Sequence, residues 1–180
     1  MPSILVLEDG TGLNNANTYC DVAFADTYHT LYSNTDWSGS TAIKETALVN
    51  ACQSLDLLYA DKFQSMKLEL HTSSTTRQAL NFPRYSFYDQ NANLRLQGEI
   101  PVELQRAQAE IALFYLAGDA MIPELNADAF IGQQTVKVGA IEQATTYKKP
   151  QQVASYAGWK KIDVLLWSIL KPKNVMRLSL

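Results

Sequence analysis

Two stretches of the chain repeat apolar residues at the spacing of an α-helix, and this repeat constrains the fold more than any other feature. In residues 41–60 the apolar side consists of Ala47, Leu48, Ala51, Cys52, Leu55, Leu58 and Tyr59. In residues 101–118 it consists of Leu104, Ala107, Ile111, Phe114 and Tyr115. An apolar stripe of this kind must be covered by another element. The pattern therefore predicts a helical bundle, with a buried core that includes Leu48, Leu55, Leu104, Ile111 and Phe114.

Capping residues support these helices and indicate two more. Asp21 is suited to cap a helix over residues 21–33, and Pro101 suits the first position of the helix that Gly118 would end. A further helical repeat covers residues 159–170 and stops before Pro172.

Short β elements complete the expected fold. Residues 4–7 resemble a short strand, and residues 135–139 alternate so that they could pair with residues 141–147. We expect residues 61–98 to be irregular, with aromatic side chains packed back on the helices. The fold class is thus mainly α: a small helical bundle with short β elements and an extended C-terminal arm.

Charge divides the chain into two parts. Residues 148–180 carry seven basic residues and one acid, a net charge of +6, whereas residues 1–147 carry eight bases and 17 acids, a net charge of −9. We therefore divide the protein into a helical body with small β elements (1–147) and a basic C-terminal helix and docking arm (148–180). The overall charge of −3 does not fit a protein that coats nucleic acid.

The sequence contains no recognisable catalytic constellation. His29 and His71 have no partner at metal-ligand spacing, and residues 9–12 resemble a turn more than a phosphate-binding loop. Cys20 and Cys52 could form one bridge, but two buried thiols are favoured. We expect no enzymatic activity, no metal and no cofactor.

No targeting or membrane segment is evident in the sequence. The apolar run of residues 4–7 is short, lacks a basic start and is followed by acids. No window approaches the ~18 apolar residues of a membrane span. We therefore expect no membrane association and synthesis in the cytoplasm.

One aromatic cluster has two interpretations. Phe82, Tyr85, Phe87 and Tyr88 surround Arg84, and such a group could stack the bases of single-stranded nucleic acid. Because few other basic residues lie nearby, packing of a long loop is the favoured interpretation.

A series of short motifs extends over most of residues 9–140. The N-terminal motifs are residues 9–12, residues 15–19, Val22, Ala25, Asp26, Tyr28 and Trp37. The later motifs are residues 47–56, residues 78–84, Ile100, Pro101, Ala107, Ala109, Glu110, Ala112 and residues 136–139. Together they resemble a family of tailed-phage and prophage proteins that is often labelled DnaT-like ssDNA-binding protein.

Members of this family resemble head–tail adaptor, or head-completion, proteins. The resemblance implies a ring of about twelve copies that binds the portal protein and a downstream neck or tail protein. Double-stranded DNA would pass through the ring without specific binding. The protein would be located in the host cytoplasm during assembly and in the neck of the finished virion. The alternative is a single-stranded DNA-binding accessory protein.

The C-terminal arm provides the candidate portal-binding residues. They are Trp167, Lys171, Lys173, Met176, Arg177, Leu178 and Leu180. The arm could add as a strand to the edge of a partner's sheet, with its alternating apolar side chains in pockets of that partner. The basic residues could steer the arm to an acidic surface of the partner. A solvated helix followed by a frayed tail remains the alternative.

Overall fold

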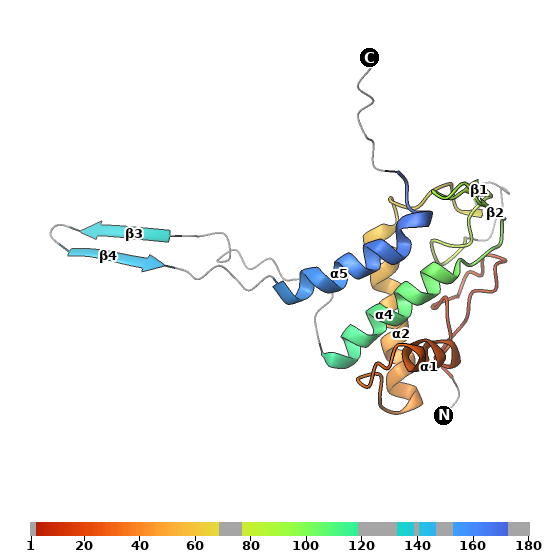
Figure 1. The fold of residues 1–180 in the computed structure, drawn as a ribbon, viewed down its shortest axis with the longest axis horizontal. Coiled ribbons are helices and arrows are strands. Elements are labelled where there is room, and N and C mark those ends of the chain that lie inside the picture. The colour runs from red at the N-terminus through yellow and green to blue at the C-terminus, as the bar shows by residue number, and fades with distance from the viewer. Residues whose placement is uncertain (1–2, 69–76, 119–132, 139–140, 147–152, 173–180) are drawn as a thin grey trace, which may run out of the picture.

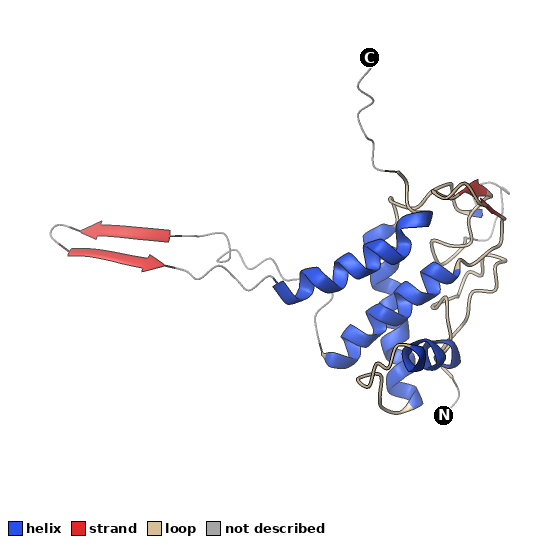
Figure 2. Cartoon of the chain, in the orientation of Figure 1, coloured by secondary structure: helices blue, strands red, loops and turns tan. Residues whose placement is uncertain are grey.

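The computed structural model describes residues 3–68, 77–118, 133–138, 141–146 and 153–172. It is mainly α with short β elements, as predicted (Figures 1 and 2). The helices are α1 (Val22–Leu31), α2 (Thr41–Tyr59), α4 (Val102–Ala117), α5 (Val153–Leu166) and the 3-10 turn η2 (Trp167–Ile169). The strands are β1 (Phe87–Tyr88), β2 (Leu94–Arg95), β3 (Gln133–Val138) and β4 (Ile141–Thr146).

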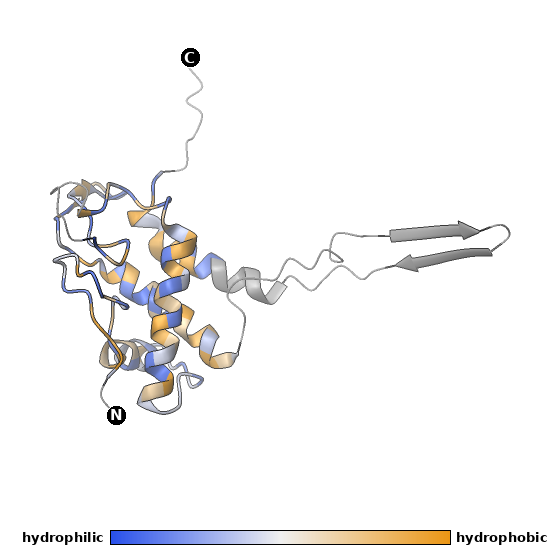
Figure 3. Cartoon of the chain, turned by 180° about the vertical axis from the view of Figure 1, so that it is seen from behind, coloured by the Kyte–Doolittle hydropathy of each residue, from blue (hydrophilic) through white to orange (hydrophobic). Residues whose placement is uncertain are grey.

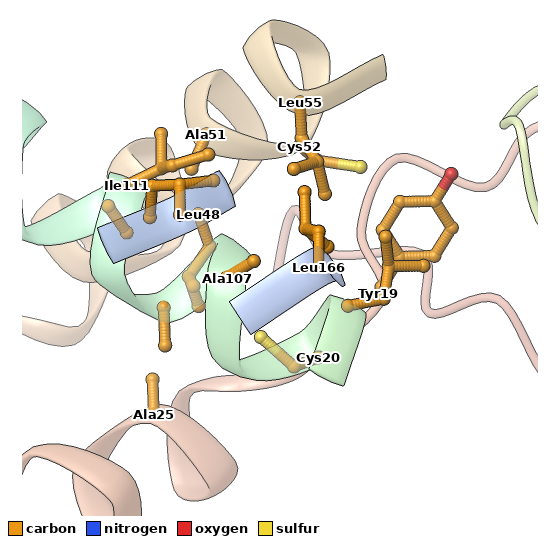
Figure 4. Packing of buried hydrophobic residues seen from close by; sticks show 14 of the residues in the cluster. Tyr19, Cys20, Ala25, Leu48, Ala51, Cys52, Leu55, Ala107, Ile111 and Leu166 are labelled. Atoms are coloured by element: carbon orange, nitrogen blue, oxygen red, sulfur yellow. The ribbon is translucent and has the colours of Figure 1, made fainter. Parts of the chain in front are cut away.

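The core lies where α2 and α4 pack against each other; α5 packs on α4, and α1 contacts both α2 and α4. Leu48, Leu55, Leu104 and Ile111 are fully buried, as predicted. Phe114 is only partly buried and packs at the margin of the core, so its predicted burial was wrong in degree. Figure 4 shows the side chains of α2 and α4 meeting those of the N-terminal segment and α5.

The C-terminal helix belongs to the same core. Ile162, Leu166 and Ile169 are fully buried within it. The helix starts at Val153, six residues before the predicted start, and changes to 3-10 geometry after Leu166. Figure 3 shows apolar and hydrophilic residues alternating along the helices of the bundle, as expected for elements with one buried side.

The predicted caps Asp21 and Gly118 are present, whereas Pro101 lies one position outside its predicted place. The Asp21 carboxylate accepts a hydrogen bond of 2.8 Å from the Phe24 backbone N–H. Gly118 ends α4 in the left-handed conformation, with φ of 79°. Pro101 lies immediately before the first residue of α4, one position earlier than predicted.

Residues 4–7 do not form the predicted strand. Only Leu7 bridges to Thr18. The Asn17 side chain instead accepts from the Val6 N–H (2.8 Å) and donates to the Ile4 carbonyl (2.9 Å). Two backbone hydrogen bonds also join this segment to residues 17 and 18, but the Asn17 side chain takes the neighbouring positions, so no regular ladder develops.

Residues 61–98 contain a small hairpin that was not predicted. Strands β1 and β2 pair antiparallel, with Phe87 opposite Arg95 and Tyr88 opposite Leu94. The expected inward packing of aromatics holds for Phe82, which is buried, whereas Tyr88 is 67% exposed.

The second hairpin was predicted correctly. Strands β3 and β4 pair antiparallel from Gln133 opposite Thr146 to Val138 opposite Ile141. Among the elements that the structure describes, this hairpin contacts no helix. Figure 1 shows it lying away from the bundle.

Candidate functional site

The candidate site is the place where the C-terminal arm leaves the bundle. Leu170 pairs antiparallel with Phe63. The Lys171 N–H donates to the Lys62 carbonyl at 2.7 Å, and the Gln64 N–H donates to the Ile169 carbonyl at 3.1 Å. The root of the arm, residues 168–171, is thus joined by backbone hydrogen bonds to the segment that follows α2.

Two glutamine side chains clamp this root. The Gln64 amide donates to the carbonyls of Ser168 (3.3 Å) and Leu170 (3.0 Å). The Gln90 amide, from the turn between β1 and β2, donates to the carbonyls of Trp167 (2.6 Å) and Leu170 (2.9 Å). The clamps bond backbone carbonyls at the end of the C-terminal helix, and they hold residues 167–170 against the segment after α2 and the β1–β2 turn.

Two of the predicted docking residues lie at the root. The Trp167 side chain is 51% exposed, although its carbonyl is bound by Gln90. Lys171 is exposed and donates through Nζ to the Asp61 carbonyl at 2.7 Å. The other predicted docking residues lie outside the described residues; they are Lys173, Met176, Arg177, Leu178 and Leu180.

The sequence analysis missed an exposed apolar pair beside this root. Tyr88 and Leu94 are cross-strand partners of the β1–β2 hairpin, and both are exposed. The same hairpin touches η2 through Gln90. Two-residue strands give no alternating pattern that would have pointed to this pair.

Arg84, at the centre of the possible base-stacking platform, is not available to a ligand. Arg84 is only 6% exposed. Its guanidinium donates to the backbone carbonyls of Asn81, Gln64, Ser65 and Ala60 over 2.7–3.2 Å. It also lies over the rings of Phe63 and Phe82, at 5.3 and 5.5 Å from their centroids. Arg84 therefore joins the end of α2 to the following loop and cannot also receive a phosphate.

Two other basic residues of the body, Lys44 and Arg95, form ion pairs with acids. Arg95 binds the carboxylates of Asp89 (3.0 Å), Glu99 (2.9 Å) and Glu103 (2.6 Å). These acids raise the pKa of the Arg95 guanidinium, even though burial opposes the charge. Such a group is neutralised and offers little attraction to nucleic acid.

The glycine-containing loop of residues 9–12 is filled by the protein's own carboxylate. Glu8 is buried and accepts from the N–H groups of Gly10 (3.0 Å), Gly12 (2.9 Å) and Leu13 (3.0 Å). Converging backbone N–H groups are what a phosphate loop offers its ligand. Because Glu8 already occupies them, this segment is a structural turn, as predicted.

Residues of the family motifs form a buried hydrogen-bond network with Gln108, which is not part of those motifs. Gln108 accepts from the Tyr19 N–H (2.9 Å) and donates to Thr18 Oγ1 (2.7 Å) and the Leu48 carbonyl (2.8 Å). The Tyr19 hydroxyl donates to Asp56 at 2.6 Å. Burial, followed by the nearby Asp56 charge, raises the pKa of Tyr19 well above its ordinary value. These residues hold the N-terminal segment on α2 and α4 rather than forming an open site.

A second motif pair has a similar structural role. The Asp26 carboxylate accepts from Trp37 Nε1 (2.6 Å) and from Lys44 Nζ (2.8 Å). It therefore ties α1 to the loop after it and to the start of α2.

His29 is a buried structural residue. Its Nε2 lies 3.1 Å from the Ala109 carbonyl, and its Nδ1 lies 2.9 Å from the Asn34 amide nitrogen. Since a carbonyl only accepts, Nε2 carries the proton and Nδ1 accepts, which is the neutral form. Burial lowers the pKa of His29.

The two cysteines lie in the core. Cys20 and Cys52 are buried free thiols, as favoured above, and burial raises the pKa of both. No cluster of three potential metal ligands occurs in the described ranges. None of the helices in those ranges has the length and hydropathy required to cross a bilayer.

The fold and the site define a small, mainly helical protein whose last described residues are held by two glutamine side chains. The chain belongs to the family described as "Putative DnaT-like ssDNA binding protein", whose model matches residues 3–180. The family likeness predicted from the motifs is confirmed, while the head–tail adaptor role stays a prediction. No match was found among curated proteins or among solved structures.

Proposed function

We propose that the protein is a structural head–tail adaptor: a ring-forming protein that binds beneath a phage portal, joins it to the next neck or tail protein and lets DNA pass. The observation that carries the proposal is the clamped root of the arm. A basic terminal segment leaves a rigid acidic body at a fixed point, which suits a protein that docks on another by an extended arm.

The internal pairing of basic groups supports a conduit rather than a DNA grip. Arg84 is bound to carbonyls, while Arg95, Lys44 and Lys161 are each bound to acids. A passage for DNA should not hold phosphates, because each held phosphate would resist movement and would release counterions on binding.

The second candidate is a single-stranded DNA-binding accessory protein, and the description of the family favours it. The acidic body and the burial of Arg84 weigh against it. Binding to single strands would have to use basic residues other than those paired within the body.

One experiment separates the two candidates. The chain is co-expressed with the portal protein of the same phage or prophage, and the purified complex is imaged by electron microscopy. The adaptor proposal expects a ring on the portal. In parallel, the protein alone is titrated with a fluorescent oligonucleotide at several salt concentrations. Tight binding that weakens steeply with salt, together with no ring, would favour the second candidate.

Variants of the arm test how the protein would dock. Replacing Met176, Leu178 and Leu180 by Ser should abolish retention on the portal. Replacing Lys173 and Arg177 by Gln should slow association and reduce its dependence on salt. If both variants assemble like the unchanged chain, the arm is not the anchor.

A further inference from the structure

The β3–β4 hairpin has two unpaired edges. Each strand has six residues, and within the described part of the chain β3 and β4 pair only with each other. Neither strand contacts a helix of that part, and Figure 2 shows both strands lying away from the bundle. A sheet of two strands is marginally stable at best in water, and an unpaired edge offers its N–H and C=O groups to another strand. The hairpin therefore has the geometry of a sheet that a partner completes.

The sequences of the two strands suit pairing at these edges. Residues 133–138 and 141–146 contain neither Pro, which blocks an exposed edge, nor Gly, which weakens a strand. Strand β3 carries one base, Lys137, and β4 carries one acid, Glu142. These two residues lie opposite each other in the register of the hairpin. The hairpin thus has one edge formed by a basic strand and one edge formed by an acidic strand.

This charge difference favours a second copy of the chain as the partner. If β4 of one copy pairs antiparallel with β3 of the next in the register of the hairpin, Glu142 lies opposite Lys137 of that next copy, a favourable cross-strand pair. Pairing β3 with β3, or β4 with β4, cannot do this, because β3 has no acid and β4 has no base. The same register also keeps Val136, Val138 and Ile141 of both copies on one face of the sheet.

We propose that the hairpins of neighbouring copies join edge to edge, with β4 of one copy hydrogen-bonded to β3 of the next. One β3 edge and one β4 edge stay free at the ends of such a pair, so the contact is heterologous and can repeat until a ring closes. The contact would join the copies in an adaptor ring, but it does not rest on the adaptor function, since it needs neither the portal nor DNA.

Disulfide trapping in the full-length protein tests the pairing. Lys137→Cys and Glu142→Cys proteins are mixed and oxidised, and peptide mapping identifies the bridge. Because directly opposite positions lie within reach of a disulfide, the mixture should form the mixed dimer at least fivefold faster than either variant alone forms a dimer. The matched control is Glu142→Cys mixed with Leu31→Cys, since Leu31 is 76% exposed on α1 of the bundle. A mixed-dimer rate no higher than that of the control, or of a single variant, would overturn the proposal.

Charge reversal gives a second readout, the self-association constant measured by sedimentation velocity. Lys137→Glu places two acids opposite each other, both within the hairpin and between copies, so self-association should weaken at least threefold. The swapped variant Lys137→Glu/Glu142→Lys restores both pairs and should restore association. Lys160→Glu, at an exposed position of α5, changes the net charge equally and should leave association unchanged.

Three results of the sedimentation experiment would overturn the proposal. The first is a protein that is monomeric at every concentration. The second is a swapped variant that associates no better than Lys137→Glu. The third is an equal loss for Lys160→Glu, because net charge rather than the pairing of β3 with β4 would then control association.

Discussion

Gly10 and Gly98 meet backbone to backbone, and Gly10 has no room for a side chain on the facing side. A Cβ atom on Gly10 would collide with the Gly98 carbonyl, and Gly10 has a φ of 94°. Through this contact the loop that surrounds Glu8 rests directly on the segment that leads into α4. The contact helps to align the N-terminal segment with the bundle.

Replacing Gly10 by Ala should therefore destabilise the protein by roughly 2–5 kcal/mol. The positive φ contributes about 1–2 kcal/mol and the collision about 1–3 kcal/mol. Urea denaturation followed by circular dichroism measures the loss. Gly12→Ala is the matched control, because its φ is 82° but a Cβ there only approaches the Gln78 side chain, at 3.4 Å. Equal losses for the two variants would contradict the proposed collision.

Acidification from pH 7.5 to 5.5 should lower the stability through His29. Its pKa is lowered from 6.5 by burial, so its contribution is complete above the pKa of the unfolded chain and is lost as the pH falls below it. Protonation would also set an N–H at Nδ1 against the Asn34 amide. The urea midpoint should therefore fall over this range.

The His29→Gln variant provides the control for this pH effect. The carboxyls whose pKa is lowered, including Asp26 and Asp9, titrate below pH 4 and do not contribute in this range. Asp56 has a raised pKa, chiefly from burial, and acts in the opposite direction. If the variant keeps the full pH dependence, His29 is not its source.

Leu55→Ala and Ile111→Ala should each cost roughly 2–5 kcal/mol, because both side chains are fully buried between α2 and α4. Leu31→Ala should change the free energy of unfolding by less than about 0.5 kcal/mol, since that side chain is exposed. Losses below about 1 kcal/mol at both core positions would mean that the core can collapse around the cavities.

Arg84→Lys should destabilise the fold by about 2–4 kcal/mol and should not weaken oligonucleotide binding by the folded protein. An ammonium group cannot bond four separate carbonyls as the guanidinium does, and buried carbonyls would lose their donors. Arg77→Lys, at an exposed position, is the control. The measurements are urea midpoints and oligonucleotide titrations. A stable Arg84→Lys protein with weakened oligonucleotide binding would restore the stacking interpretation.

The sequence predicted those features that a single element encodes by itself. The helical period located α2 and α4, and Asp21 and Gly118 marked helix ends, because capping depends on neighbours a few residues away. Alternation likewise located the β3–β4 hairpin. The start of α5 was placed too late because its first turns carry few large apolar residues.

The remaining features depend on contacts between distant parts of the chain. Gln64 and Leu170 are 106 positions apart, and no local pattern assigns a glutamine to a distant carbonyl. A sequence in which an arginine lies among aromatic residues also does not show what the rings contact. They could stack on the bases of a nucleic acid, or they could pack on the guanidinium of that arginine. Only the four carbonyls around Arg84 distinguish these cases.

The clamps on the arm's root determine where a mechanical force would act. Tension applied beyond Pro172 reaches the antiparallel hydrogen bonds at Lys62 and Gln64 before it reaches the helical turns of α5. The amides of Gln64 and Gln90 share that tension with the segments on either side of Arg84. A pull on the arm is thereby spread over α2, the loop after it and the β1–β2 turn, and α5 is spared from unwinding from its end.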